Sequence, residues 1–139
     1  MRSILLSMGH EDKKLQEICD DTGLTPSAAS SLLLSLSSHN LTERKVPVTE
    51  DHTSRRAVYS ISDGIFRFWY TYVFPYQSEI ELRQGEAVFN TFVLPSLDSY
   101  TKNTFETICR EFLVLTDEMG TAPFPMKNVG KWWGQHPTK

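Results

Sequence analysis

The strongest constraint on the fold comes from residues 14–41, KLQEICDDTGLTPSAASSLLLSLSSHNL, which predict two helices joined by a tight turn. Gly23 allows the turn, Thr25 is a good N-cap, and Pro26 suits the first helical position. Apolar residues in both segments recur at helical spacing, so each helix has one face for a core. These residues are Leu15, Ile18, Cys19, Ala29, Leu32, Leu33 and Leu36.

Further elements are predicted on both sides of this helix pair. Residues 3–8, SILLSM, predict a short first helix. Residues 46–48 and 57–61 alternate apolar and polar side chains as half-buried strands do, and Pro47 marks the first of them as an edge strand. Three helices followed by a β-hairpin have the order of a winged helix-turn-helix, which we expect at residues 1–62.

A winged helix most often binds DNA through the second helix of its motif. The outward face of this helix carries Ser27, Ser31 and Leu34, which can contact base edges, phosphates or a thymine methyl group. The helix has no Lys or Arg, so it offers no counterion release, the main source of affinity for DNA. The basic pairs of this region lie in the hairpin instead, where we expect them to contact phosphates. They are Arg44, Lys45, Arg55 and Arg56.

The same surface can serve a protein partner, with Leu34 as an anchor, and the basic pairs can be simply solvated. The formal net charge of −3 predicts no bulk attraction to DNA or to acidic membranes. The sequence has no signal-peptide pattern and no apolar run long enough to span a membrane. We therefore expect a cytoplasmic protein that does not enter a membrane.

The cysteines and histidines predict no metal site and no cofactor. Cys19 and Cys109 are the only cysteines, and each lies among apolar residues at helical spacing. This setting is typical of buried, reduced thiols rather than of a disulfide or a metal pair. The four histidines are not spaced as ligands.

The segment GIFRFWYTYVFPY, residues 64–76, has seven aromatic residues in thirteen positions. Asp63 is a natural N-cap for a helix here, and Pro75 stops the aromatic stretch, which is therefore no membrane segment. Base stacking normally needs cations beside the rings, and only Arg67 lies in this segment. The apolar arc is wider than a surface helix needs, so we expect a helix buried on most sides that joins two lobes. The arc comprises Ile65, Phe66, Phe68, Trp69, Tyr72 and Val73.

The last seventy residues predict more helix. Pro95 should break or restart a helix that begins near residue 86, and residues 103–115 follow with one apolar face. Glu106 and Arg110 have the spacing of an i, i+4 ion pair. Residues 117–128 predict a loop, and VGKWWG at residues 129–134 predicts the start of a strand. The apolar residues of the two helices are Val88, Phe89, Phe92, Val93, Phe105, Ile108, Cys109 and Phe112.

Three blocks together, SISDGIFRFWYTYVFP, TFETICREF and VGKWWG, resemble the C-terminal part of a family of archaeal and bacterial ATPases. The resemblance implies a P-loop ATPase domain, a winged helix and a C-terminal domain of unknown function that is similar to the PD-(D/E)XK, or restriction-endonuclease-like, fold. It therefore implies an α+β, mostly helical chain with a winged helix-turn-helix at residues 1–62 and an incomplete nuclease-like lobe at residues 63–139.

The departures from this family pattern bear on activity. The sequence has no G-x-x-x-x-G-K-[ST] motif, so we expect no ATP site of the family's kind. Glu106 matches the acidic residue on the first helix of the nuclease-like fold, but no carboxylate follows Glu118, and one carboxylate cannot build an oxygen site for a metal. We expect Glu106 to be a surface salt-bridge residue, and the chain to be a piece cut at both ends.

These observations favour a non-enzymatic, DNA-associated winged-helix module derived from the ATPase family. The alternative is a protein-interaction, regulatory or oligomerisation module that docks on an ATPase or on itself. The remnant of a metal-dependent nuclease is a third hypothesis, which needs ligands supplied by another chain.

Overall fold

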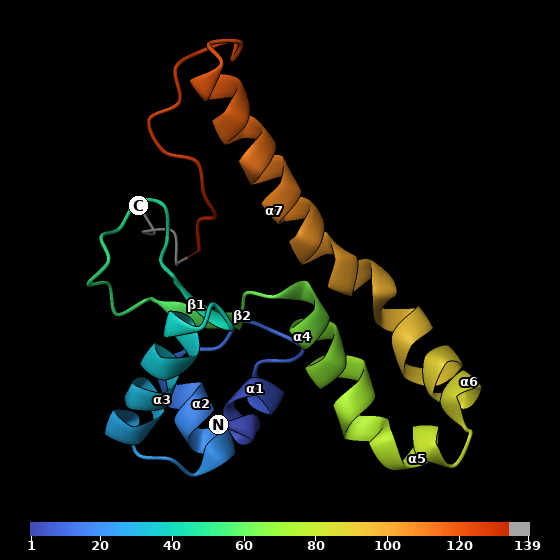
Figure 1. Cartoon of the computed structure of the whole chain (residues 1–139). Coiled ribbons are helices and arrows are strands. Elements are labelled where there is room, and N and C mark those ends of the chain that lie inside the picture. Colours follow the sequence, from blue (N-terminus) through green and yellow to red (C-terminus); the bar gives the residue numbers. More distant parts are fainter. Residues whose placement is uncertain (134–139) are drawn as a thin grey trace, which may run out of the picture.

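The computed structural model describes residues 1–133, in which a compact N-terminal lobe carries a long helical arm (Figure 1). The three predicted helices of the lobe are present, followed by two antiparallel strands. The chain is thus mostly helical with a small antiparallel sheet. The elements of the lobe are α1 (Arg2–Ser7), α2 (Leu15–Thr22), α3 (Pro26–Ser38), β1 (Thr42–Lys45) and β2 (Val58–Ile61).

The turn between α2 and α3 follows from its sequence. Gly23 ends α2 with a φ of 68°, a left-handed conformation that costs glycine little. The hydroxyl of Thr25 accepts a hydrogen bond from the backbone N–H of Ala28 at 3.4 Å, and Pro26 is the first residue of α3. The apolar faces of α1, α2 and α3 pack in one core with the end of β2. This core comprises Ile4, Leu5, Met8, Ile18, Leu33, Leu36 and Ile61.

The sheet differs from the prediction in its first strand. The paired residues of β1 are Thr42–Lys45, whereas residues 46–48 lie beyond it. Pro47 has no N–H to donate to a ladder, and the N–H of Val48 binds the carbonyl of Lys131, 3.0 Å away. The alternation expected at residues 57–61 also fails, because Ser60 is buried beside Ile61.

The arm is a hairpin of two helices that each pass through a proline. The first helix continues through Pro75. Ahead of each proline the helix widens into one π-helical turn, in which Phe74 donates to the carbonyl of Trp69 and Leu94 to that of Phe89. The wider turn and the 3₁₀ turn after it accommodate the missing N–H and the bulk of the ring. The segments are α4 (Gly64–Phe68), π Trp69–Val73, 3₁₀ Phe74–Tyr76 and α5 (Gln77–Glu81), then α6 (Gly85–Val88), π Phe89–Val93, 3₁₀ Leu94–Ser96 and α7 (Leu97–Glu118).

The aromatic segment is less buried than its composition predicts. Tyr72 is 3% exposed, but Ile65 is 80% exposed, and Phe66, Phe68 and Trp69 are exposed too. The first helix of the arm contacts the lobe along one side and α7 along another, so its remaining arc meets neither (Figure 1). The prediction of a helix buried on most sides was wrong, although this helix does connect the lobe to the rest of the arm.

Two sets of contacts hold the arm in place. The buried hydroxyl of Thr71 donates to the carbonyl of Gly9, 2.6 Å away in the lobe. A Cβ atom on Gly9 would lie 3.0 Å from the carbonyl oxygen of Tyr70, so this close approach of two backbones requires glycine. Within the arm, the hydroxyls of Tyr72 and Ser96 are 2.7 Å apart, and the ring of Tyr100 packs edge-on against Tyr72.

The end of the described chain also departs from the prediction. Residues 129–133 form no strand, and Gly134, the last residue of the predicted segment, lies outside the described residues. From the far end of α7 the chain returns towards the lobe and lies against the loop between β1 and β2 (Figure 1). There the indole N–H of Trp133 donates to the carbonyl of Arg56 at 2.9 Å.

Candidate nucleic-acid interface

The outer face of α3 is uncovered by the described part of the chain. Ser27 and Ser31 are exposed, and their hydroxyls make no hydrogen bond with the residues of the 1–133 range. Leu34 on the same face is 73% exposed. The helix presents this face because Ala29, Leu33 and Leu36 occupy the opposite one in the core.

The four basic residues of the hairpin have three different environments. Arg44 donates to the carbonyls of His52 and Ser54, at 2.6 and 2.8 Å, and so holds the loop that follows β1. Lys45 forms ion pairs with Asp12 at 3.3 Å and Glu43 at 3.2 Å, and Arg56 pairs with Glu50 at 2.8 Å. Arg55 is exposed and has no hydrogen bond or ion pair with any described residue. The structure therefore does not bring the four cations together as one free patch.

The loop between the strands has its own ordering contacts. The carboxylate of Asp51 accepts hydrogen bonds from the backbone N–H and the hydroxyl of Thr53, at 2.8 and 2.5 Å. The hydroxyl hydrogen bond, then the backbone one, lowers the pKa of Asp51 below its ordinary value. Ser54 also donates to Glu50. These contacts, with those of Arg44, order the loop between the two strands.

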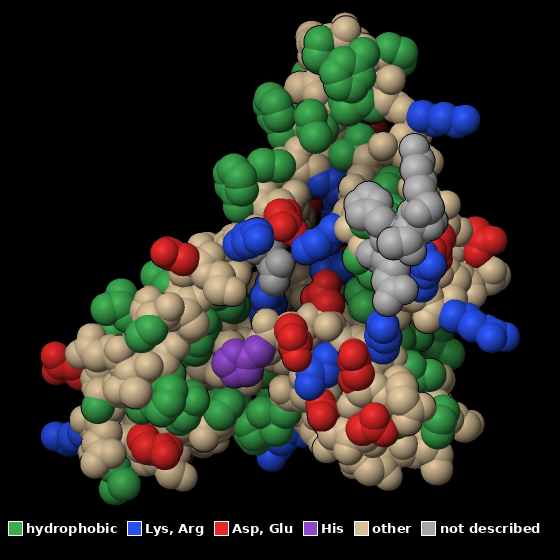
Figure 2. All heavy atoms as spheres, turned by 180° about the vertical axis from the view of Figure 1, so that it is seen from behind, with side chains coloured by type: hydrophobic (Ala, Val, Ile, Leu, Met, Phe, Trp, Pro, Cys, Tyr) green, Lys and Arg blue, Asp and Glu red, His purple; other side chains and the backbone are tan. Residues whose placement is uncertain are grey.

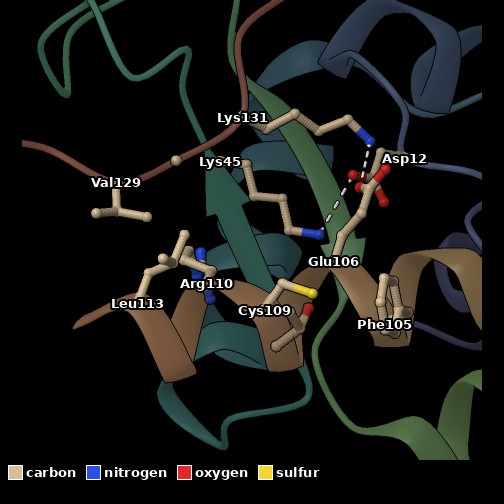
Figure 3. Close-up of a pocket in the computed structure, with 11 residues that line it drawn as sticks. Asp12, Lys45, Phe105, Glu106, Cys109, Arg110, Leu113, Val129 and Lys131 are labelled. Atoms are coloured by element: carbon tan, nitrogen blue, oxygen red, sulfur yellow. Dashed lines mark hydrogen bonds and ion pairs between the residues drawn. The ribbon is translucent and has the colours of Figure 1, made fainter. Parts of the chain in front are cut away.

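A second feature is a cavity of about 320 Å³ between α7, β1 and the returning C-terminal segment (Figure 3). Phe105, Cys109 and Leu113 from α7 provide apolar walls. Figure 3 shows Lys45 reaching in from β1 and Lys131 from the C-terminal segment, on either side of the carboxylates of Glu106 and Asp12. Both cysteines are free thiols, and Cys109 is only half-buried, so the prediction of two buried thiols holds for Cys19 alone.

Glu106 pairs with Lys131 across this cavity, at 2.8 Å, and not with Arg110 as its spacing predicts. The hydrogen bond from Lys131 lowers the pKa of Glu106, and the charges of Lys131, Lys102 and Lys45 add to the effect. The returning chain places Lys131 beside this carboxylate 25 residues away, a contact for which the sequence has no local pattern. Within residues 1–133 no three His, Cys, Asp or Glu side chains gather closely enough to hold a metal ion.

Charges on the rear face are mixed rather than segregated. Figure 2 shows Lys, Arg, Asp and Glu side chains interspersed near the middle of this face, and hydrophobic side chains along its projecting upper part. An electrostatic surface of alternating sign attracts a polyanion weakly over long range. None of the helices in the described range is long and apolar enough to cross a membrane.

One comparison with known proteins covers the second half of the chain, and another covers nearly all of it. Residues 69–138, half of the chain, match DUF234, a family of archaeal and bacterial proteins of unknown function. The chain belongs to this family. A curated relative, the uncharacterized protein MJECL04 of Methanocaldococcus jannaschii, is 29% identical over 133 residues, which are 95% of this chain and 29% of that protein. No solved structure matches the chain.

Proposed function

We propose that the chain is a non-enzymatic, DNA-associated module in which α1 to β2 act as a winged helix. Ser27, Ser31 and Leu34 would enter the major groove, while hairpin residues contact phosphates beside it. The observation that carries the proposal is the open outer face of α3, since no described part of the chain covers it. We further propose that this module derives from a larger ATPase family; the chain spans 29% of the length of its curated relative.

The ion pairs of the hairpin do not exclude phosphate contacts. All three pairs lie near the surface, with the side chains of Lys45 and Arg56 31% and 55% exposed. Surface pairs contribute about 0–1 kcal/mol, so a phosphate can replace a carboxylate at little cost. Arg55 is free to contact DNA directly, whereas Arg44 acts by ordering the loop. Because α3 adds no cation, we expect modest affinity.

The test follows the anisotropy of a fluorescent random-sequence duplex from ~50 to ~200 mM salt. The double variant Arg55→Ala, Arg56→Ala should bind all duplexes more weakly and flatten the salt dependence by about two units of log–log slope. A control, Arg83→Ala, removes an exposed cation between α5 and α6, away from the hairpin (Figure 1), and should leave binding unchanged. Absence of binding by the unaltered chain at the lowest salt would contradict the proposal. Equal affinity in the double variant would contradict the hairpin contacts.

A protein-interaction or regulatory module that docks on an ATPase through α3 is the second candidate. The observation that favours it is that Arg44, Lys45 and Arg56 already form hydrogen bonds or ion pairs with groups of this chain. Under this alternative Leu34 is an apolar anchor, and Leu34→Asp would disrupt docking. If the chain binds no duplex at any salt concentration, the open face of α3 would be assigned to a protein partner instead.

A further inference from the structure

From Phe105 to its C-cap residue Met119, α7 has an apolar stripe that the described chain leaves largely exposed. Its five residues follow the 3, 4, 3, 4 spacing of the a and d positions of a coiled coil, across two heptads. Each is between 48% and 66% exposed. They are Phe105, Ile108, Phe112, Leu115 and Met119, which we call the α7 seam.

The returning chain covers the face of α7 next to the seam, and of the seam residues only Phe105 also borders the cavity there. Residues 129–131 lie over Glu106, Cys109, Arg110 and Leu113, where the cavity forms. Beyond that contact α7 projects away from the lobe and from the other helices of the arm (Figure 1), with hydrophobic side chains along the projecting part (Figure 2). A contiguous apolar stripe of this size on a surface marks an interaction site.

We propose that the α7 seam pairs in parallel with the α7 seam of a second copy of this chain. The charges beside the seam support this choice of partner and direction. In a parallel pair the g position of one helix faces the next e position of the other. In the projecting part of α7, Glu111 would face Thr116, so no like charges meet.

An antiparallel pair is disfavoured by the same residues. In antiparallel coils the g positions face each other, and Glu111 and Glu118 occupy g positions here. Two registers align most of the seam. In one Glu111 opposes the Glu111 of the other copy, and in the other it opposes Glu118. Opposed like charges destabilise a helix pair.

The available area is sufficient for a weak dimer. An aromatic side chain buries roughly 200 Å² and an aliphatic one less, so five that are about half to two-thirds exposed offer at most about 500 Å² per copy. The pair would bury at most about 1,000 Å², the lower limit for a specific interface. We therefore expect a reversible dimer with a dissociation constant in the micromolar range.

The test is sedimentation equilibrium of the full chain from ~1 to ~200 µM, a range that brackets micromolar dissociation constants. The unaltered chain should pass from monomer to dimer, and Phe112→Asp should stay monomeric. Ile65→Asp is the matched control, because it makes the same kind of change at an exposed residue of α4 and should still dimerise. Circular dichroism checks that each variant keeps its helix content.

The parallel direction is tested by cross-linking in a Cys109→Ser background. Leu115→Cys lies on the seam and should form a disulfide-linked dimer on mild oxidation, whereas Val114→Cys, beside it on the same helix, should not. A monomer at every concentration overturns the proposal, as does a dimer that persists in Phe112→Asp or is lost equally in Ile65→Asp. Cross-linking of both cysteine variants alike, or of neither, overturns the parallel arrangement.

This inference goes beyond the proposed function and does not depend on it. Phe112→Asp leaves α3 and the hairpin unaltered, so a monomeric variant that still binds duplex DNA separates the two proposals. Dimerisation without DNA binding would support pairing through the α7 seam and would contradict the proposal of a DNA-associated module.

Discussion

The helices of the N-terminal lobe and the last helix of the arm have the same kind of apolar stripe but opposite burial. Leu33 and Leu36 of α3 are 2% and 1% exposed, whereas Phe112 of α7 is 62% exposed. Both stripes repeat with helical spacing, and both helices form as predicted. The difference shows that periodicity determines which face of a helix is apolar, while packing decides whether that face is covered within the chain.

The largest expected effect is a loss of stability when a buried side chain of the lobe core is shortened. Ile18→Ala removes a fully buried side chain from the lobe core and should lower the free energy of unfolding by about 2–5 kcal/mol. Ile108→Ala removes the same atoms from the exposed seam and should lower it by less than about 0.5 kcal/mol. Urea denaturation at low protein concentration, where the chain is monomeric, measures both. Equal losses would mean that the seam is covered within a single chain.

A smaller effect is expected where the two regions meet. Gly9→Ala would push the backbone of residues 70–71 away from the lobe, because its Cβ would lie 3.0 Å from the carbonyl oxygen of Tyr70. We expect a loss of about 1–3 kcal/mol in the free energy of unfolding, as for other overpacked sites. Gly64→Ala is the control, since no atom lies within 4 Å of its Cβ position and α4 begins there. Thermal unfolding of the two variants in parallel would show no difference if the lobe and the arm were independent.

The smallest effect concerns the contact between α7 and the returning chain. Lys131→Met removes the hydrogen bond that lowers the pKa of Glu106, so this pKa should rise towards its ordinary value. NMR titration of the Glu106 carboxyl group measures the change, with Lys127→Met as a control. A pKa that does not move would mean that the returning segment does not hold Lys131 at α7 in solution.

The sign of the linked pH effect follows from the lowered pKa. Glu106 contributes stability above the ordinary pKa of a glutamate, and that contribution is lost as the pH falls through the lowered pKa of the folded state. Because the pair is exposed to solvent, the whole contribution should be small. In Lys131→Met the stability of the chain should therefore depend less on pH in the acidic range.

Much of the candidate interface was predictable, and the parts that were not depend on contacts distant in sequence. Ser27, Ser31 and Leu34 lie on the open face of α3 because local periodicity assigns the opposite face to the core. The partners of the basic residues were not predictable: Lys45 reaches Asp12, 33 positions away, through the folding of the lobe. The division of the chain at residues 62 and 63 and the contacts with DNA remain predictions.

The sequence by itself determined the helices of the lobe, their caps and the turn at Gly23, because these depend on neighbouring residues and on backbone preferences. Only the tertiary structure decided that the helix continues through Pro75, that residues 46–48 leave the sheet, and that the aromatic segment and the α7 seam stay largely exposed. Each of these outcomes depends on which distant segment lies against the chain. Burial is a property of the packed molecule, and a pattern of residues along the chain specifies only which side chains are available for it.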